Sequence, residues 1–248
     1  MTPLLLLPGM MCDARLFGPQ IDALSGRVPI MPCPLGGHDT IAAIASEVLS
    51  YAPPVFALAG LSMGGIVAME MLRQAPERVA RLALLDTNPR AEQEAAKARR
   101  IPQMAAVRAG RLRDVLRDEM KPNYLARTPG RQAVLDLCMA MAMDLGPDVF
   151  LSQSAALRDR PDQCETLRSY GGPSLVLCGA EDALCPVERH ELMAGLLPDG
   201  SGTCHLISVT CYFAASVDAA RRSYRSQRLG WRWVWATSRR DSVFSQSM

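Results

Sequence analysis

The chain of 248 residues has almost no net charge and only three histidines. Lys and Arg together number 27 and Asp and Glu number 25, so the formal net charge at pH 7 is +2. A charge this small does not by itself indicate a nucleic-acid partner, because neutralising phosphates requires a strongly basic surface. Any chemistry that depends on an imidazole base has three candidate residues to draw on.

Several other signals are missing. No stretch approaches the roughly 18 to 20 apolar residues of a membrane span. The chain begins with the apolar segment MTPLLLLPGMM, which lacks a positively charged start and is cut short by Pro8-Gly9, unlike a secretory signal. The eight cysteines include no CxxC pair, the common signature of a structural zinc site. We therefore expect a cytoplasmic protein with reduced thiols, no metal and no membrane contact.

Short apolar runs alternate with helical patterns in the first half of the chain. Strands are predicted at residues 4–7, 28–31, 55–59 and 82–85, and helices at residues 40–51 and 63–74. After a long interruption the alternation resumes, with a strand predicted at 174–178 and a helix at 186–197. Continuous apolar strands that alternate with helices indicate a parallel sheet covered on both faces.

The interruption runs from about residue 88 to residue 169. Strand signals disappear there, and Arg, Glu, Ala, Met and Leu dominate. We interpret the block as three or four helices, with loops at Pro122, Pro129 and Pro147, that form a helical cap inserted into a core made of residues 1–87 and 170–210. The alternative is that they are ordinary helices packed on the sheet.

The segment GLSMG at residues 60–64 fits the pattern G-x-S-x-G. By itself the match is weak, because a chain of this length contains one by chance roughly one time in ten. Its position between a predicted strand and a predicted helix is much more specific, since a nucleophile elbow requires that context. Glycines permit the tight turn, and the helix start directs free N–H groups at developing negative charge. Ser62 is the predicted nucleophile.

Four segments of the chain together resemble the α/β-hydrolase superfamily, above all its small, capped bacterial esterase-like members. They are LLLLPGMMCDARLF, FALAGLSMGGIVAMEML, RLALLDTNP and LVLCGAEDALCP. The resemblance implies a mostly parallel central sheet flanked by helices, with an inserted helical cap. It also implies that the backbone N–H groups of Met10 and Met63 form the oxyanion hole. The implied reaction is cleavage of a carboxylic ester or thioester through an acyl-enzyme on Ser62, with no cofactor and no metal.

Two aspartates are candidates for the carboxylate that orients the catalytic histidine. Members of the family commonly carry it in the loop after the strand predicted at 174–178, where Asp182 lies, and the order Ser, Asp, His along the chain is the one that this fold uses. Some members carry it at the end of the preceding strand, where Asp86 lies. We favour Asp182, although either carboxylate can instead cap a loop.

The base is chosen from the three histidines. His38 lies in a Gly-Gly-His-Asp loop, and His190 has charged neighbours in a predicted helix, so we interpret it as a solvated surface residue. Only His205 follows Asp182, which makes it the candidate base.

The segment around His205 leaves an alternative open. In the family the histidine follows an apolar strand that ends in Gly-His, and the residues DGSGTC before His205 do not form such a strand. A different register makes residues 205–209 the last strand and puts Tyr212 at the histidine position. The protein would then lack a working base and would bind a ligand without turning it over.

The last part of the chain, residues 211–248, departs from the family. From Cys204 onward there are seven arginines and two aspartates, and all three tryptophans fall between Trp231 and Trp235. Three interpretations remain: a basic, aromatic surface for nucleic acid or membrane, an ordinary terminal helix with a disordered end, or a frameshift near Gly200. We expect a small-molecule ester or thioester as partner, no nucleic acid and no membrane, and a monomer or homodimer. A perhydrolase or C–C bond hydrolase on the same scaffold is the other enzymatic alternative.

Overall fold

The computed structural model describes residues 1–121, 130–179, 181–198 and 206–209, the last of these by their backbone. Within these residues, parallel strands form one sheet in the order β2-β1-β3-β4-β5-β6. The strands are β1 (Leu4–Leu7), β2 (Ile30–Pro32), β3 (Phe56–Leu61), β4 (Val79–Leu85), β5 (Ser174–Gly179) and β6 (Leu206–Val209). The predicted fold class, a parallel sheet flanked by helices, is confirmed.

The helices join the strands as crossover connections and fill the predicted interruption. They are η1 (Ala14–Phe17), α1 (Gly18–Leu24), α2 (Ile41–Tyr51), α3 (Met63–Gln74), η2 (Pro76–Arg78), α4 (Glu94–Arg108), α5 (Leu112–Asp114), η3 (Val115–Met120), α6 (Arg131–Arg158), α7 (Cys164–Arg168) and α8 (Val187–Leu196). Helix α2 begins where its sequence predicts, because the Thr40 hydroxyl accepts a hydrogen bond from the Ala43 N–H at 3.2 Å. The short helices η1 and α1 have no counterpart among the predicted elements.

Both faces of the sheet are covered, which explains why its strands are predominantly apolar. On one face, Leu5 and Leu7 of β1 join the main core with residues of α2, α3, α7 and α8. On the other face, Leu6 packs with Phe17, and residues of α1 extend this smaller cluster. Successive side chains of a strand point to opposite faces, so a strand buried on both faces needs an uninterrupted apolar run.

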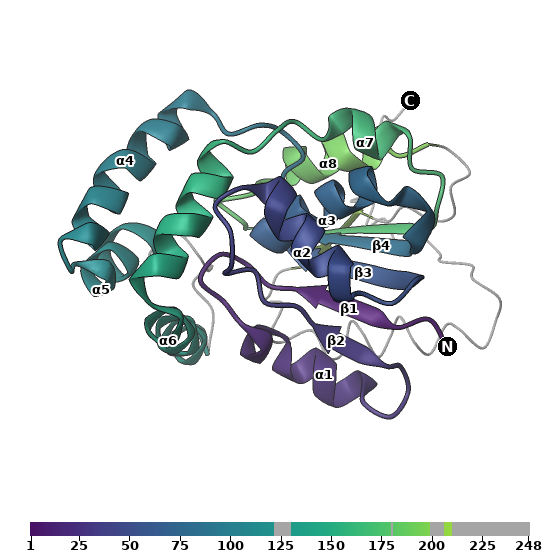
Figure 1. Ribbon diagram of the computed structural model, residues 1–248, viewed down its shortest axis with the longest axis horizontal. Helices are drawn as coiled ribbons and strands as arrows, with labels where there is room; N and C mark the ends of the chain where they lie inside the picture. Colours follow the sequence, from purple (N-terminus) through teal and green to yellow (C-terminus); the bar gives the residue numbers. More distant parts are fainter. Residues whose placement is uncertain (122–129, 180, 199–205, 210–248) are drawn as a thin grey trace, which may run out of the picture.

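Helices α4, α5 and α6 stand beyond the edge of the sheet at which β1 ends (Figure 1). They share an apolar cluster of their own with Met11, which follows β1. Helix α6 breaks at Gly146, where φ is 81° and ψ is 179°, next to the predicted break at Pro147. The predicted breaks at Pro122 and Pro129 lie outside the described residues. Helix α7 packs instead on α3 and α8 of the core, so a cap that extends over all of residues 88–169 remains a prediction.

Candidate active site

Ser62 occupies the sharp turn between β3 and α3 in a strained backbone conformation. Its φ is 53° and its ψ is −114°, values that a residue with a side chain rarely adopts. The turn is held from both sides: the Ser62 N–H donates to the Leu85 carbonyl at 2.9 Å, and the Ser62 carbonyl accepts from the Gly65 N–H at 3.0 Å and from the Thr87 hydroxyl at 2.7 Å. The side chain is half-buried. These contacts present the hydroxyl at the carboxyl end of the sheet.

The glycines around Ser62 are required by close backbone contacts. A Cβ on Gly60 would clash with the backbone of Gly64. A Cβ on Gly64 would clash with the carbonyl of Leu7 and would lie 2.7 Å from the carbonyl oxygen of Pro8. The start of α3 therefore rests directly on the end of β1, and a backbone atom cannot give way as the end of a flexible side chain can.

Replacing Gly64 with alanine is expected to destabilise the protein by about 3 kcal/mol or more, because the new Cβ forces β1 and α3 apart. Urea unfolding monitored by circular dichroism measures the loss. Gly195→Ala is the matched control: Gly195 lies in α8, and a Cβ there meets nothing within 4 Å. That control should be neutral or stabilising by up to about 1 kcal/mol. Equal stability of Gly64→Ala and the unsubstituted protein would contradict this packing.

The loop after β1 lies against the Ser62 turn. A Cβ built on Gly9 would be 3.7 Å from the Ser62 Cβ, so the backbone of the Pro8-Gly9-Met10 segment passes beside the serine. Among the described residues, no hydrogen bond uses the backbone N–H of Met10. The N–H of Met63 belongs to the first turn of α3, where backbone donors have no partner within the helix. Two backbone donors thus flank Ser62 without an acceptor in the part of the chain that the structure describes.

The next residue, Met11, is also strained and is held in place by α6. Its φ is 56°, and its N–H donates to Oε1 of Gln153 at 2.8 Å. Gln153 is buried, and its Nε2 donates to the Leu35 carbonyl at 3.2 Å. The loop that carries Met10 is therefore supported from the α4–α6 side of the molecule. Gln153 was not among the predicted site residues, since a single glutamine in a helical block carries no signal of this contact.

Both candidate acids lie at the same edge of the sheet, at the ends of neighbouring strands. Asp86 follows β4 with a φ of 44°, and its Oδ1 accepts from the Gly179 N–H at 2.8 Å. Burial, opposed by the hydrogen bond from the Gly179 N–H and assisted by the nearby Asp182 carboxylate, raises the pKa of Asp86 to about 6. Oδ1 of Asp182 accepts from the N–H groups of Leu184 and Cys185 at 2.8 and 2.9 Å. The structure thus brings the two aspartates together, so proximity alone does not choose between them.

His190 is buried, which corrects its interpretation as a solvated surface residue. Its Nε2 accepts from the Thr87 N–H at 3.1 Å, and its Nδ1 lies 3.3 Å from the Pro186 carbonyl oxygen, to which the Nδ1–H can donate. Burial lowers the pKa of His190, which favours the neutral ring that accepts at Nε2. Charged neighbours concealed this position because consecutive residues of a helix point in different directions. Through Thr87, which also binds the Ser62 carbonyl, His190 supports the serine turn.

The other two histidines are His38 and His205, and the structure describes only the first. His38 is exposed, and its Nε2 lies 3.7 Å from a carboxylate oxygen of Glu47 on α2. His205 lies outside the described residues. The strand that follows it, β6, pairs in parallel with β5, with Leu206 opposite Val176 and Val209 opposite Gly179.

The register of β6 affects whether His205 can lie at the same edge of the sheet as Ser62. Ser62, Asp86 and Asp182 all follow the carboxyl ends of parallel strands, whereas His205 precedes the amino end of β6. The strand over 206–209 is the one required by the alternative register, in which Tyr212 takes the histidine position. Tyr212 and the whole of the basic tail lie outside the described residues.

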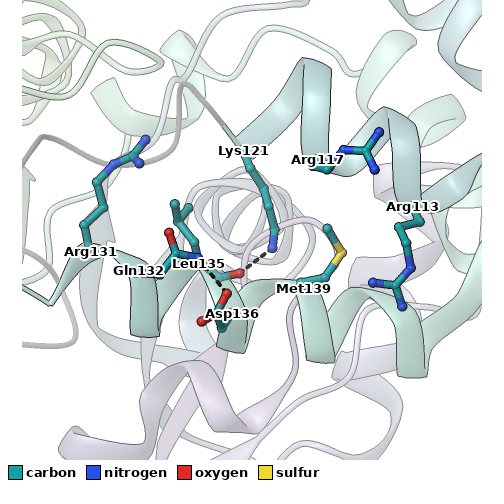
Figure 2. Close-up of a pocket in the computed structure, with 8 residues that line it drawn as sticks. All are labelled: Arg113, Arg117, Lys121, Arg131, Gln132, Leu135, Asp136 and Met139. Atoms are coloured by element: carbon teal, nitrogen blue, oxygen red, sulfur yellow. Dashed lines mark hydrogen bonds between the residues drawn. The ribbon is translucent and has the colours of Figure 1, made fainter.

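A separate hollow lies on the helical part, between η3 and the start of α6 (Figure 2). Its basic side chains are those of Arg113, Arg117, Lys121 and Arg131. The Nζ of Lys121 donates a hydrogen bond to the Leu135 carbonyl (Figure 2). No predicted site residue lines this hollow, so it is distinct from the predicted active site.

The described residues contain neither a cluster suited to a metal ion nor a helix suited to a membrane. No group of three or more His, Cys, Asp or Glu side chains there is arranged to hold a metal ion. None of the helices in that part is both long and apolar enough to cross a bilayer.

The chain is similar in sequence and in structure to known hydrolases. Residues 4–210 match the model of the "Alpha/beta hydrolase family". A thermophilic esterase from Thermogutta terrifontis is 26% identical, with a TM-score of 0.78 over 92% of this chain and 88% of that chain. A hydrolase from Pseudomonas aeruginosa (22% identical, TM-score 0.76) and the enol-lactonase from Burkholderia xenovorans (17% identical, TM-score 0.76) share the fold, each over 92% of this chain and 90% of theirs.

Proposed function

Because the chain belongs to the alpha/beta hydrolase family, we propose that it is a serine hydrolase that cleaves a carboxylic ester or thioester through an acyl-enzyme on Ser62. The observation that carries this proposal is the strained turn of Ser62 beside the Gly9-Met10 loop. Strain of this kind persists only where the surrounding structure enforces it, and it concentrates at functional sites. The esterase of 26% identity supports ester substrates for this chain as well.

The proposed mechanism uses backbone donors and an acid–base pair. The Ser62 hydroxyl attacks the substrate carbonyl while a base takes its proton. The N–H groups of Met10 and Met63 bind the oxyanion, and their lack of other acceptors in the described structure suits them to that role. Asp182 orients the imidazolium, which gives the proton to the departing alcohol or thiol. Water, deprotonated by the same base, then attacks the acyl-enzyme and releases the acid, and the proton returns to Ser62. The sequence assigns the base to His205.

A second candidate function follows from the position of β6. If the strand over 206–209 sets the position of the histidine, His205 lies at the wrong end of the strand. The chain would then be a member of the family that keeps the Ser62 turn and binds a small ligand without a working base. The two candidates differ in the reactivity of Ser62, because only a base-activated serine attacks an electrophile at an appreciable rate.

A fluorophosphonate probe tests the proposal directly. We expect one covalent adduct per folded chain, mapped by mass spectrometry to the peptide that contains Ser62. The exposed Ser25 and Ser50 of the same molecule are internal controls and should remain unmodified. Heat-denatured protein should not react, because activation requires the assembled site. A folded protein that forms no adduct would contradict the proposal and favour the second candidate.

Helices α4 to α6 are proposed to form the cap over this site. They lie beyond the carboxyl edge of the sheet (Figure 1) and hold the Met10-Met11 loop through Gln153. Their methionines suit the apolar carbon chain of a small or medium acyl group. The partner is then a small molecule, bound between the cap and the sheet.

A further inference from the structure

A buried carboxylate bridges two arginines next to the proposed site. Glu92, in the segment between β4 and α4, accepts from Nη2 of Arg100 at 2.8 Å and lies 3.1 Å from Nη2 of Arg160. The side chains of Glu92 and Arg160 are 8% and 7% exposed, and that of Arg100 is 16% exposed. The cluster therefore lies largely out of contact with water, although Arg100 remains reachable.

The charges of this cluster do not balance. Two guanidinium groups face one carboxylate, which leaves one positive charge in a region of low dielectric constant. A buried charge without a partner is unfavourable, whereas a charge that meets an anionic ligand is stabilised. Arg160 is committed to the protein, because its Nε also donates to the Arg90 carbonyl at 3.0 Å. Arg100, the more exposed of the two arginines, is therefore the guanidinium that an anionic ligand can reach.

Arg100 has one edge engaged and one edge open. Its Nε and Nη2 donate to Oε2 of Glu92 at 3.1 and 2.8 Å. Among the described residues, the only polar contact of its Nη1 is the Met10 sulfur, 3.9 Å away. A thioether is a weak acceptor, so the two N–H groups of Nη1 are available to a stronger one. The edge held by Glu92 fixes the direction of the edge that is open.

This open edge lies at the proposed oxyanion loop. Met10 follows Gly9, whose backbone passes beside Ser62, and the Met10 N–H is a proposed oxyanion donor. We propose that Arg100 binds a free carboxylate of the substrate, so that the substrate class is an ester or thioester of a dicarboxylic acid or of another anionic acyl group. The inference rests on the proposed function, which places the reacting carbonyl at Ser62 and the Met10 N–H. Nη1 of Arg100 contacts the sulfur at the far end of the Met10 side chain, whereas the proposed oxyanion donor is the Met10 backbone N–H, so we expect several carbons between the carboxylate and that carbonyl.

The experiment measures binding rather than turnover, so that it does not depend on the base. In the Ser62→Ala protein, isothermal titration calorimetry compares monomethyl adipate, which carries one carboxylate, with the neutral dimethyl adipate. We expect the monoanion to bind more tightly. Arg100→Gln should weaken monomethyl adipate by about 10- to 100-fold, the effect of one charged hydrogen-bonding group, and should leave dimethyl adipate unchanged. Arg99→Gln is the matched control, since Arg99 is the exposed neighbour on the same helix, and it should change neither.

Three results would overturn the inference. The Ser62→Ala protein could bind monomethyl adipate no more tightly than dimethyl adipate. Otherwise, Arg100→Gln could leave the tighter binding of monomethyl adipate intact, or it could weaken the binding of both esters equally. The last result would indicate a structural role of the Glu92 cluster. Failure of the proposed function appears elsewhere, as the absence of a fluorophosphonate adduct on Ser62 in a folded protein, so the two failures are distinguishable.

Discussion

Replacing Ser62 with alanine is expected to lower kcat for a short-chain p-nitrophenyl ester by about 10⁴- to 10⁶-fold. The physical reason is that the variant keeps the backbone donors of Met10 and Met63 but has no nucleophile to form the acyl-enzyme. Steady-state release of p-nitrophenol measures the loss. Alanine keeps the turn, because the bonds that hold it from Leu85, Gly65 and Thr87 all involve the backbone of residue 62, so the thermal midpoint should change little.

Controls separate this effect from a general loss of folded protein. Ser50→Ala removes an exposed hydroxyl that donates to the Glu47 carbonyl and should keep full activity. If the unsubstituted protein turns over no faster than Ser62→Ala, the proposed hydrolase function is contradicted. His205→Ala in the same assay identifies the base: a loss as large as that of Ser62→Ala assigns the proton transfer to His205, and an unchanged rate removes it from the mechanism.

Replacing Asp182 with asparagine is expected to lower kcat by about 10⁴-fold, because an amide cannot stabilise the imidazolium that forms during proton transfer. The structure supplies a matched control in Asp86→Asn, which alters the neighbouring carboxylate at the same edge. The Asp86 carboxylate accepts from the Gly179 N–H, and an asparagine oxygen can accept the same bond. We therefore expect Asp86→Asn to keep most of the activity. A greater loss in Asp86→Asn than in Asp182→Asn would make Asp86 the acid.

The raised pKa of Asp86 also predicts how the stability of the unsubstituted protein changes with pH, and Asp86→Asn should lack this change. The folded pKa of Asp86, about 6, lies above its ordinary value of 3.8, so the folded protein holds this proton more tightly than the unfolded chain. The contribution to stability is then fully present below the unfolded pKa and is lost as the pH rises from about 4 through about 6. The fall amounts to no more than about 3 kcal/mol. Urea unfolding across this range should show the fall in the unsubstituted protein and not in Asp86→Asn.

The sequence by itself determined the class of the fold and the turn that carries Ser62, the proposed nucleophile. Short apolar runs such as residues 4–7, bounded by turn residues and alternating with helical patterns, are typical of strands buried on both faces, which requires helices on each side. The motif at residues 60–64 specified the turn because its glycines allow contacts that no side chain permits, and those contacts are local to the strand and the helix that it joins. Caps such as Thr40 set helix boundaries in the same local way.

Tertiary structure alone decided the surroundings of Ser62. Asp86 and Asp182 are far apart in the chain, and only the pairing of β4 with β5 places their carboxylates together. The burial of His190 depends on which face of α8 meets Thr87, and the bridge from Arg100 through Glu92 to Arg160 joins segments on either side of the helical block. Local sequence patterns predict where each helix or strand forms. The contacts between elements depend on strand order and helix packing, which act between residues that the sequence does not place side by side.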